Sequence, residues 1–295
     1  MEEIVNMIDL HAHILHGLDD GPETLTESLE MIRVGYQDGI RVIVATPHTH
    51  NGIYQNDRAT ILAKVQELNN ALKEFGIQNS GASVRNSKSE IRHAPRRAHG
   101  SPEPHMVQGA LCNLQSAIPM KILPGADVHF LADMLPRYER GEIETVNDQG
   151  RFVMVEFPSQ GIPYRAEEVL YQFIVRGIIP IISHPERNLE IGHKAKRYYE
   201  MIRMGCLGQV TAMSLTGEFG NGVRRVAEKL LSKRLLHIIA SDAHSTNGRP
   251  PILSSAAKAA EKIVGKEEAW RMVTEYPQAI LNGQRPEVPV LGEWK

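Results

Sequence analysis

The stretch RFVMVEFPSQGIPYRAEEVLYQFIVRGIIPIISH, residues 151–184, decides the fold. Its two ends, residues 151–157 and 178–184, are short apolar runs rich in β-branched side chains, which are typical of buried strands. Residues 165–177, between them, have the apolar periodicity of a helix. A strand, a helix and a second strand in this order predict a parallel βαβ unit.

The same alternation continues along the rest of the chain. Strands are predicted at residues 4–10, 40–46, 120–127, 206–212 and 235–244. Helices are predicted at residues 23–39, 58–76, 194–205, 223–234, 254–265 and 267–276. About seven strand–helix units favour an α/β fold whose parallel sheet forms a closed or nearly closed barrel. A doubly wound open sheet is the alternative, but no GxGxxG motif follows the first strand.

Length and composition narrow the class of protein. The 295 residues suit one large α/β domain or two ordinary ones, and the net charge of −2 gives no reason to expect nucleic acid binding. The two cysteines, Cys112 and Cys206, cannot build a cysteine zinc site or a disulfide framework, which favours a reducing compartment. Because we find no signal peptide and no apolar run long enough to cross a membrane, we expect a cytoplasmic globular protein without membrane insertion.

Residues 78–118 interrupt the alternation. They are rich in Ser, Pro, Arg and His and are locally basic, and the segments on either side would join smoothly without them. We therefore predict a single domain over residues 1–295 with an insertion at 78–118. We expect this insertion to be a flexible loop rather than a dedicated binding element.

Histidines and carboxylates follow the carboxyl ends of the predicted strands, which form the active-site face of a parallel β/α barrel. His11 and His13 are two positions apart on one strand, so both imidazoles point to the same side and can bind one metal ion. One histidine at a strand end is more often a surface or capping residue, but the coincidence across several strands favours a shared site. The candidate ligands are His11, His13, Asp20, His48, Asp127, Glu156, His184, Asp242 and His244.

These nitrogen and oxygen donors suit Zn²⁺, Mn²⁺ or Fe²⁺ and argue against Ca²⁺ or a thiolate cluster. Because one ion takes about three or four protein ligands, so many candidates imply two or three ions. We interpret the remaining histidines as ordinary or solvated residues. They are His16, His50, His93, His99, His105, His129, His193 and His237.

Two arginines lie on loops at the same predicted face, Arg187 shortly after His184 and Arg249 shortly after His244. Arginine binds phosphate through a bidentate fork, so the pair favours a phosphate ester as substrate, although a surface ion pair would explain either arginine alone. Neither cysteine has the arginine spacing of a cysteine-dependent phosphatase, and no GxSxG or P-loop motif is present. Metal-activated water is therefore the expected nucleophile.

Six blocks of the chain resemble the PHP (polymerase and histidinol phosphatase) superfamily. They are MIDLHAHILHGLDDGP, VATPHTHNGIY, LPGADV, FVMVEFP, IISHPERN and ASDAHSTNGRPP. The DDGP, HPER and SDAH…RPP elements look most like the bacterial metal-dependent protein-tyrosine phosphatases of capsular and exopolysaccharide biosynthesis. The resemblance covers nearly the whole chain except residues 78–118.

The resemblance implies a distorted (β/α)7 TIM-like barrel, the PHP fold, with up to three divalent ions. The ions would commonly be Mn²⁺, with Zn²⁺, Fe²⁺ or Mg²⁺ as alternatives, and Arg187 and Arg249 would bind the phosphate. The implied substrate is the tyrosine-rich tail of a cognate autophosphorylating tyrosine kinase, and its dephosphorylation would control polysaccharide export. The implied ligand groups are His11, His13 and Asp242; Asp127, Glu156 and His184; and Asp20, His48 and His244.

The chain departs from the family at Asp127, where the family usually carries Glu. The Asp side chain reaches about 1.5 Å less far, so a bridging carboxylate is lost there or the loop shifts to compensate. Two other functions stay open. One is a different PHP phosphoesterase, acting on histidinol phosphate or a nucleotide, and the other is a non-catalytic scaffold that binds the kinase.

Overall fold

The computed structural model describes residues 6–74 and 120–291. The chain divides into two compact units, Met1–Asn69 with Met120–Lys295, and Asn70–Pro119. The strands and the candidate site belong to the first unit. The predicted insertion at 78–118 lies outside the described residues, and so do Cys112 and the histidines expected to be solvated there.

Short strands build the centre of the first unit. Their bounds are β1 Met7–Ala12, β2 Ile40–Ala45, β3 His48–Thr49, β4 Lys121–Pro124, β5 Asp127–His129, β6 Phe152–Glu156, β7 Ile179–Ser183, β8 Leu207–Thr211 and β9 Ile238–Ala240. The ladders between these strands are parallel, and the sheet orders are β1-β2-β4 and β3-β5-β6-β7-β8-β9.

The two sheets are parts of one distorted ring. β3 follows β2 closely in the chain, and β5 follows β4 in the same way. β2 pairs with β4 in one sheet, and β3 pairs with β5 in the other. Between β4 and β5 the chain needs a glycine at Gly125, because a Cβ at this position would lie 2.7 Å from Val44 Cγ1. The ring closes where Ala12, at the end of β1, forms a parallel bridge with Ala243, just after β9. This arrangement confirms the predicted α/β class with parallel strands, distorted by the interruptions.

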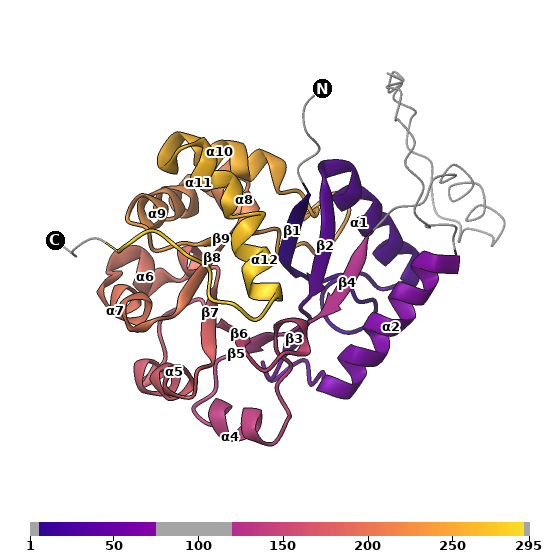
Figure 1. Ribbon diagram of the computed structural model, residues 1–295, viewed down its shortest axis with the longest axis horizontal. Coiled ribbons are helices and arrows are strands. Elements are labelled where there is room, and N and C mark those ends of the chain that lie inside the picture. The colour runs from indigo at the N-terminus through magenta and orange to yellow at the C-terminus, as the bar shows by residue number, and fades with distance from the viewer. Residues whose placement is uncertain (1–5, 75–119, 292–295) are drawn as a thin grey trace, which may run out of the picture. The chain divides into compact units, whose positions relative to one another are not determined.

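Most helices follow the strands and surround them, whereas α12 lies across the middle of the strands in this view (Figure 1). Their bounds are α1 Leu25–Asp38, α2 Arg58–Glu74, α4 Met134–Glu139, α5 Ala166–Val175, α6 Leu189–His193, α7 Lys196–Met204, α8 Ala212–Thr216, α9 Gly220–Ser232, α10 Ser254–Val264, α11 Lys266–Arg271 and α12 Glu275–Leu281. Short 3₁₀ turns cover Val146–Asp148 and Pro185–Arg187. None of the helices in the described ranges is long and apolar enough to cross a membrane.

Local sequence explains where helix α1 begins and ends. Thr24 and Glu27 form a reciprocal capping box, in which each side chain accepts a hydrogen bond from the other residue's backbone N–H. At the other end Gly39 has a φ of 102°, the left-handed conformation that glycine adopts at helix ends without steric cost.

The prediction of one helix over residues 267–276 is wrong in the middle of that range, where α11 ends at Arg271 and α12 begins at Glu275. The carbonyl groups of Met272 and Val273 accept hydrogen bonds from the backbone of β9 and β1 instead, at 3.2 and 2.8 Å. The strands therefore donate hydrogen bonds to the carbonyl groups that would otherwise accept bonds within a continuous helix. Periodicity alone could not reveal this tertiary contact.

The apolar core fills the ring toward the amino ends of the strands. On β6, Phe152 and Met154 are buried in this core, and Glu156 follows on the same face of the strand. On β8, Leu207 is in the core and Gln209 follows on the same face. These two strands thus pass from apolar to polar side chains toward their carboxyl ends, which is where the site lies.

Candidate metal centre

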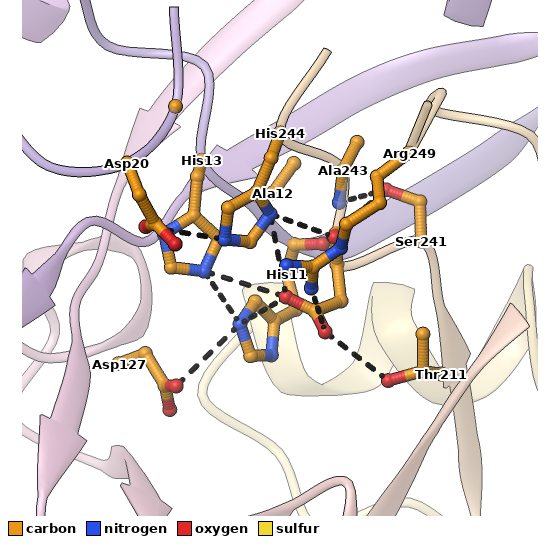
Figure 2. Close-up of polar contacts among 12 residues, drawn as sticks. His11, Ala12, His13, Asp20, Asp127, Thr211, Ser241, Ala243, His244 and Arg249 are labelled. Carbon is orange, nitrogen blue, oxygen red and sulfur yellow. Dashed lines mark hydrogen bonds and ion pairs between the residues drawn. The ribbon is translucent and has the colours of Figure 1, made fainter. Parts of the chain in front are cut away.

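The two histidines of the HxH motif meet at the end of β1, as the strand spacing predicted. His11 and His13 are fully buried, and their Nε2 atoms lie 3.1 Å apart. The pairing of β1 with β2 shifts in register between Asp9 and Ala12, and an irregularity of this kind re-aims side chains. Leu10 can therefore pack in the apolar core while the adjacent His11 points into the polar cluster (Figure 2).

Asp127 is fully buried at the start of β5, and its two carboxylate oxygens have different surroundings. Its Oδ1 accepts a hydrogen bond of 2.6 Å from the Ser183 hydroxyl, whereas its Oδ2 has no hydrogen-bond partner within the described residues. Oδ2 lies 3.7–3.8 Å from a ring nitrogen of His11, of His48 and of His184. The Asp side chain therefore reaches the imidazoles, despite being shorter than the Glu usual in the family.

A second group of donors surrounds Asp20, which is half exposed. Its Oδ1 lies 3.3 Å from His244 Nε2 and 3.7 Å from His48 Nε2. The rings of His13 and His244 stack with their centroids 3.9 Å apart. Together these four residues offer donor atoms that all lie within 4.8 Å of one another.

Glu156, at the end of β6, connects two imidazoles on the other side of the cluster. Its Oε2 lies 3.7 Å from His48 Nδ1, and its Oε1 lies 3.6 Å from His184 Nε2. The three residues His48, Asp127 and Glu156 form another compact group of donors. One carboxylate between two imidazoles has the arrangement of a bridging ligand.

Asp242 connects the histidines with the two arginines. Its Oδ1 lies 3.5 Å from Nε2 of both His11 and His13. Its Oδ2 accepts hydrogen bonds from Arg187 Nη1 at 2.7 Å and from Arg249 Nη2 at 2.5 Å. Asp242 is buried, whereas the two arginine side chains are 35% and 25% exposed. The guanidinium groups are therefore open to a ligand on one side and fixed on the other.

Two strained backbone positions occur in the cluster. His184 has a φ of 33° and Asp242 a φ of 51°, both in the left-handed region that residues with side chains rarely adopt. Such strain is typical of functional sites, where the surrounding fold maintains it.

Other buried groups orient the HxH imidazoles. The Nδ1–H of His13 donates to Asp19 Oδ2 at 2.6 Å, and the same oxygen accepts the backbone N–H of His48 at 2.9 Å. Nδ1 of His11 lies 3.0 Å from Gln209 Oε1. With both Nδ1 atoms engaged, the two Nε2 atoms are left to face the cluster, the usual arrangement of metal-binding histidines.

The electrostatics of the cluster favour a cation at its centre. Burial lowers the pKa of His11 to about 4, which keeps this imidazole in the neutral form that binds metals. Burial also opposes protonation of His13, but the Asp19 and Asp242 carboxylates outweigh it and raise the pKa of His13 to about 10. Burial acts against ionisation of Asp127 as well, yet the surrounding imidazoles hold its pKa below the usual value.

The donor set fits divalent metal ions. Three buried ligand atoms of the cluster make no hydrogen bond to the described residues, namely His48 Nδ1, Asp127 Oδ2 and His244 Nε2. Leaving such atoms unpaired in a protein interior is costly, and a metal ion would satisfy them. The structure also brings together the members of each predicted ligand group, so all the predicted ligands lie in one cluster.

Sequence reasoning missed four neighbours of the cluster. Asp19 stands beside Asp20 in the DDGP element, and only Asp20 is among the predicted ligands. The sequence predicts no special role for His129, but its Nδ1 lies 3.5 Å from Glu156 Oε2. Its position two residues after Asp127 could have revealed it, because Asp242 and His244 have the same spacing. The other two, Gln209 and Phe219, lie on β8 and on the loop after α8, where no motif marks them.

Two of the other histidines have partners outside the cluster. His16 Nε2 lies 2.9 Å from the Lys64 amine and 3.3 Å from a Glu67 oxygen. His237 accepts the backbone N–H of Gly208 on its Nδ1 at 3.0 Å. These contacts account for both residues without a metal ion.

The sequence is similar to proteins of one known family over nearly its whole length. A family model described as capsular polysaccharide synthesis, CpsB/CapC, matches residues 7–85 and 88–282. The tyrosine-protein phosphatase YwqE of Bacillus subtilis is 30% identical over 96% of both chains. The tyrosine-protein phosphatase CpsB of Streptococcus pneumoniae is 26% identical over 94% of this chain and 99% of its own.

A solved structure has the same fold. It comes from work on YwqE from Bacillus subtilis and CpsB from Streptococcus pneumoniae, described as unique metal-dependent tyrosine phosphatases. It superimposes with a TM-score of 0.80 at 29% identity, covering 98% of this chain and all of that one. Since the family model spans most of the sequence, including every residue of the polar cluster, the chain belongs to the CpsB/CapC family of capsular polysaccharide synthesis.

Proposed function

We propose that this protein is a metal-dependent protein-tyrosine phosphatase. The observation that carries the proposal is the buried Asp127 oxygen, which has three imidazole nitrogens around it and no hydrogen bond among the described residues. It lies in the same cluster as Asp242, which holds two partly exposed arginines. A cation site beside a pair of arginines suits a phosphate ester better than a neutral substrate.

The proposed ligands form three groups. They are His11, His13 and Asp242; Asp127, Glu156 and His184; and Asp20, His48 and His244. Divalent ions bound there would draw charge from the phosphoryl oxygens and activate a water molecule at neutral pH. We propose Mn²⁺ as the working ion, with Zn²⁺, Fe²⁺ and Mg²⁺ as the ions to compare.

The side chains of this protein have distinct roles in the proposed reaction. Arg187 and Arg249 bind and orient the phosphoryl group, each through the N–H groups that Asp242 leaves free. Asp19 and Gln209 hold the imidazoles of the HxH motif in position. In the hydrolysis the water oxygen forms a bond to phosphorus while the bond between phosphorus and the tyrosyl oxygen breaks. The tyrosyl oxygen takes up a proton of the water, and the products are tyrosine and hydrogen phosphate.

The proposed substrate is phosphotyrosine on a tyrosine autokinase of capsule or exopolysaccharide export. Support comes from the relatives, which are named tyrosine-protein phosphatases, and from a family description that refers to capsular polysaccharide synthesis. We further propose that the protein works in the cytoplasm, where such a kinase tail would be accessible. The buried free thiol of Cys206 is compatible with this compartment.

Phosphate release from a phosphotyrosine peptide tests the proposal. Metal-stripped protein receives Mn²⁺, Zn²⁺, Fe²⁺, Mg²⁺ or no ion, with histidinol phosphate and a nucleoside monophosphate assayed in parallel. We expect metal-restored turnover of the peptide and little turnover of the small phosphates. Turnover of a small phosphate alone would make the protein a different PHP phosphoesterase. Folded protein inactive with every ion and substrate would instead indicate a kinase-binding scaffold.

A further inference from the structure

The two arginines beside the metal centre come from separate loops and converge on one atom. Arg187 lies in the turn after β7 and Arg249 in the loop after β9, and both donate to the same Oδ2 of Asp242. One carboxylate oxygen offsets only part of the repulsion between two neighbouring guanidinium groups. Something else must hold them together when no phosphate is bound.

Phe219 lies where a third contact is needed. Its ring centroid is 5.1 Å from the guanidinium carbon of Arg187 and 5.7 Å from that of Arg249. Both distances are within the range over which an aromatic face attracts a cation. The ring is half-buried, so solvent screens these contacts less than it would at an open surface.

The position of Phe219 follows from the order of the strands. β8 pairs with β7 on one side and with β9 on the other, and Phe219 lies on the chain after β8, between α8 and α9. Three consecutive strands thus supply one arginine, the aromatic ring and the other arginine. No other aromatic ring within the described residues makes a cation–π contact with more than one guanidinium group.

We infer that Phe219 is a positioning residue for phosphate recognition, which holds the guanidinium groups of Arg187 and Arg249 as a pair with their remaining N–H edges toward the phosphoryl group. The inference rests on the proposed phosphatase function. Preorganisation of this kind lowers the ordering cost of binding, so its loss weakens binding of the phosphoryl group rather than the chemistry that follows.

Substitution of Phe219 by Leu tests the inference, because Leu keeps an apolar side chain but removes the aromatic face. For metal-loaded Phe219→Leu we expect KM for a phosphotyrosine peptide, and Kd for inorganic phosphate by calorimetry, to rise about 5- to 30-fold. We expect kcat to change less than about threefold. Phe219→Trp, which restores an aromatic face, should recover most of the lost affinity.

Coupling to the arginines separates this role from simple packing. In an Arg187→Ala background one of the two cation–π contacts is already gone, so Phe219→Leu should weaken phosphate binding only about 2- to 5-fold further. Phe173→Leu is the control, because Phe173 is a buried ring of α5 that contacts Tyr138 edge to face and makes no cation–π contact with the described arginines. It should leave KM unchanged, and metal content should be equal in all variants.

The outcomes distinguish the inference from the proposed function. If the wild-type protein hydrolyses the peptide but Phe219→Leu binds phosphate normally, the positioning role is wrong and the phosphatase function stands. An equal loss of phosphate binding with and without Arg187 would also overturn it, because the effect would then not pass through the arginines. If the wild-type protein lacks peptide turnover with every ion, the phosphatase function fails, and phosphate calorimetry still tests Phe219.

Discussion

Both ends of the strand ring bury side chains, but the two ends differ in chemistry. Toward the amino ends, Phe152, Leu207 and Ile238 belong to one cluster of buried apolar side chains, which carry no polar atoms that need a partner. Toward the carboxyl ends, His11 and Asp127 are just as inaccessible, yet ionisable groups face one another there and some donor atoms make no hydrogen bond within the described residues. Burial at the amino end stabilises the fold, whereas burial of incompletely paired ionisable groups at the carboxyl end lowers the free energy of unfolding.

The difference shows how function can be recognised in a fold without a bound ligand. Burying apolar surface is favourable, whereas burying incompletely paired ionisable groups is unfavourable unless a bound ion or ligand compensates their charge. Substitutions at the amino end should therefore change the stability of the fold, and substitutions at the carboxyl end should change metal and phosphate binding.

Removing both imidazoles of the HxH motif should have the largest effect. For His11→Ala with His13→Ala we expect loss of bound metal and a fall in kcat/KM of more than about 1,000-fold, because these residues face three carboxylates at the centre of the cluster. Metal analysis and phosphate release measure both quantities. His193→Ala, at an exposed position of α6, is the control. Retained metal and unchanged turnover in the double variant would end the metal interpretation.

At the amino end, Phe152→Ala should lower the free energy of unfolding by about 3–5 kcal/mol, because it leaves a cavity in the apolar cluster. Denaturant unfolding monitored by circular dichroism measures this loss. The fraction that remains folded should bind metal with wild-type affinity. A loss of metal affinity in folded Phe152→Ala would break the division between the two ends.

Arg187→Ala should reduce transition-state binding by about 2–4 kcal/mol, judging from truncations of hydrogen-bonded charge pairs. The variant loses a phosphate contact and also leaves Asp242 with one arginine fewer. Steady-state kinetics on a phosphotyrosine peptide measure the effect, and Arg203→Ala on the exposed face of α7 serves as the control. A small change in KM together with an unchanged kcat would show that Arg187 does not bind the phosphate.

Asp19→Asn should weaken metal binding by about 10- to 100-fold, because the carboxylate that orients His13 through a 2.6 Å hydrogen bond loses its charge. Titration calorimetry with Mn²⁺ measures the change directly. Asp133→Asn, at an exposed position paired with Arg137, provides the matched substitution away from the site. Equal affinities in the two variants would mean that Asp19 has no role in holding the metal.

Glu144 is a buried carboxylate outside the cluster and should show the smallest effect. Burial and the nearby Asp148 raise its pKa to about 7, although Arg58 lies 3.2 Å away. Between about pH 4.5 and pH 7 the folded protein then holds more protons than the unfolded chain, so this residue's contribution to stability falls as pH rises. For an isolated group such a shift would be worth about 3 kcal/mol, and solvent screening at the partly exposed Arg58 reduces the expected loss to about 1–2 kcal/mol.

Unfolding of metal-free wild-type protein and Glu144→Gln, compared from about pH 5 to about pH 8, measures this contribution. The variant should lose less stability across the range. Identical pH profiles would show that Glu144 keeps an ordinary pKa.

Much of the site could be predicted because its information is local in the sequence. Strand period placed His11 and His13 on one side, and the barrel rule placed His184 and Glu156 at the same face. The fold class followed equally well from the alternation of strands and helices. The interruptions between β2 and β3 and between β4 and β5 could not be predicted, because each depends on how neighbouring strands fit.

The residues that were missed act through contacts between distant parts of the chain. Gln209 meets His11 across 198 positions, and nothing around either residue signals the pairing. Phe219 contacts its two arginines only because β8 lies between β7 and β9. His129 was different, since the spacing from Asp127 was visible and only the position of Glu156 was needed to interpret it.

The number of ions bound per chain tests the central claim most directly. Metal-stripped protein is loaded with Mn²⁺, freed of unbound ion by gel filtration and analysed by mass spectrometry of the metal, beside the His11→Ala and His13→Ala double variant. The account predicts two or three ions per wild-type chain and fewer in the double variant. A wild-type chain that retains no ion, or the same number as the double variant, would contradict it.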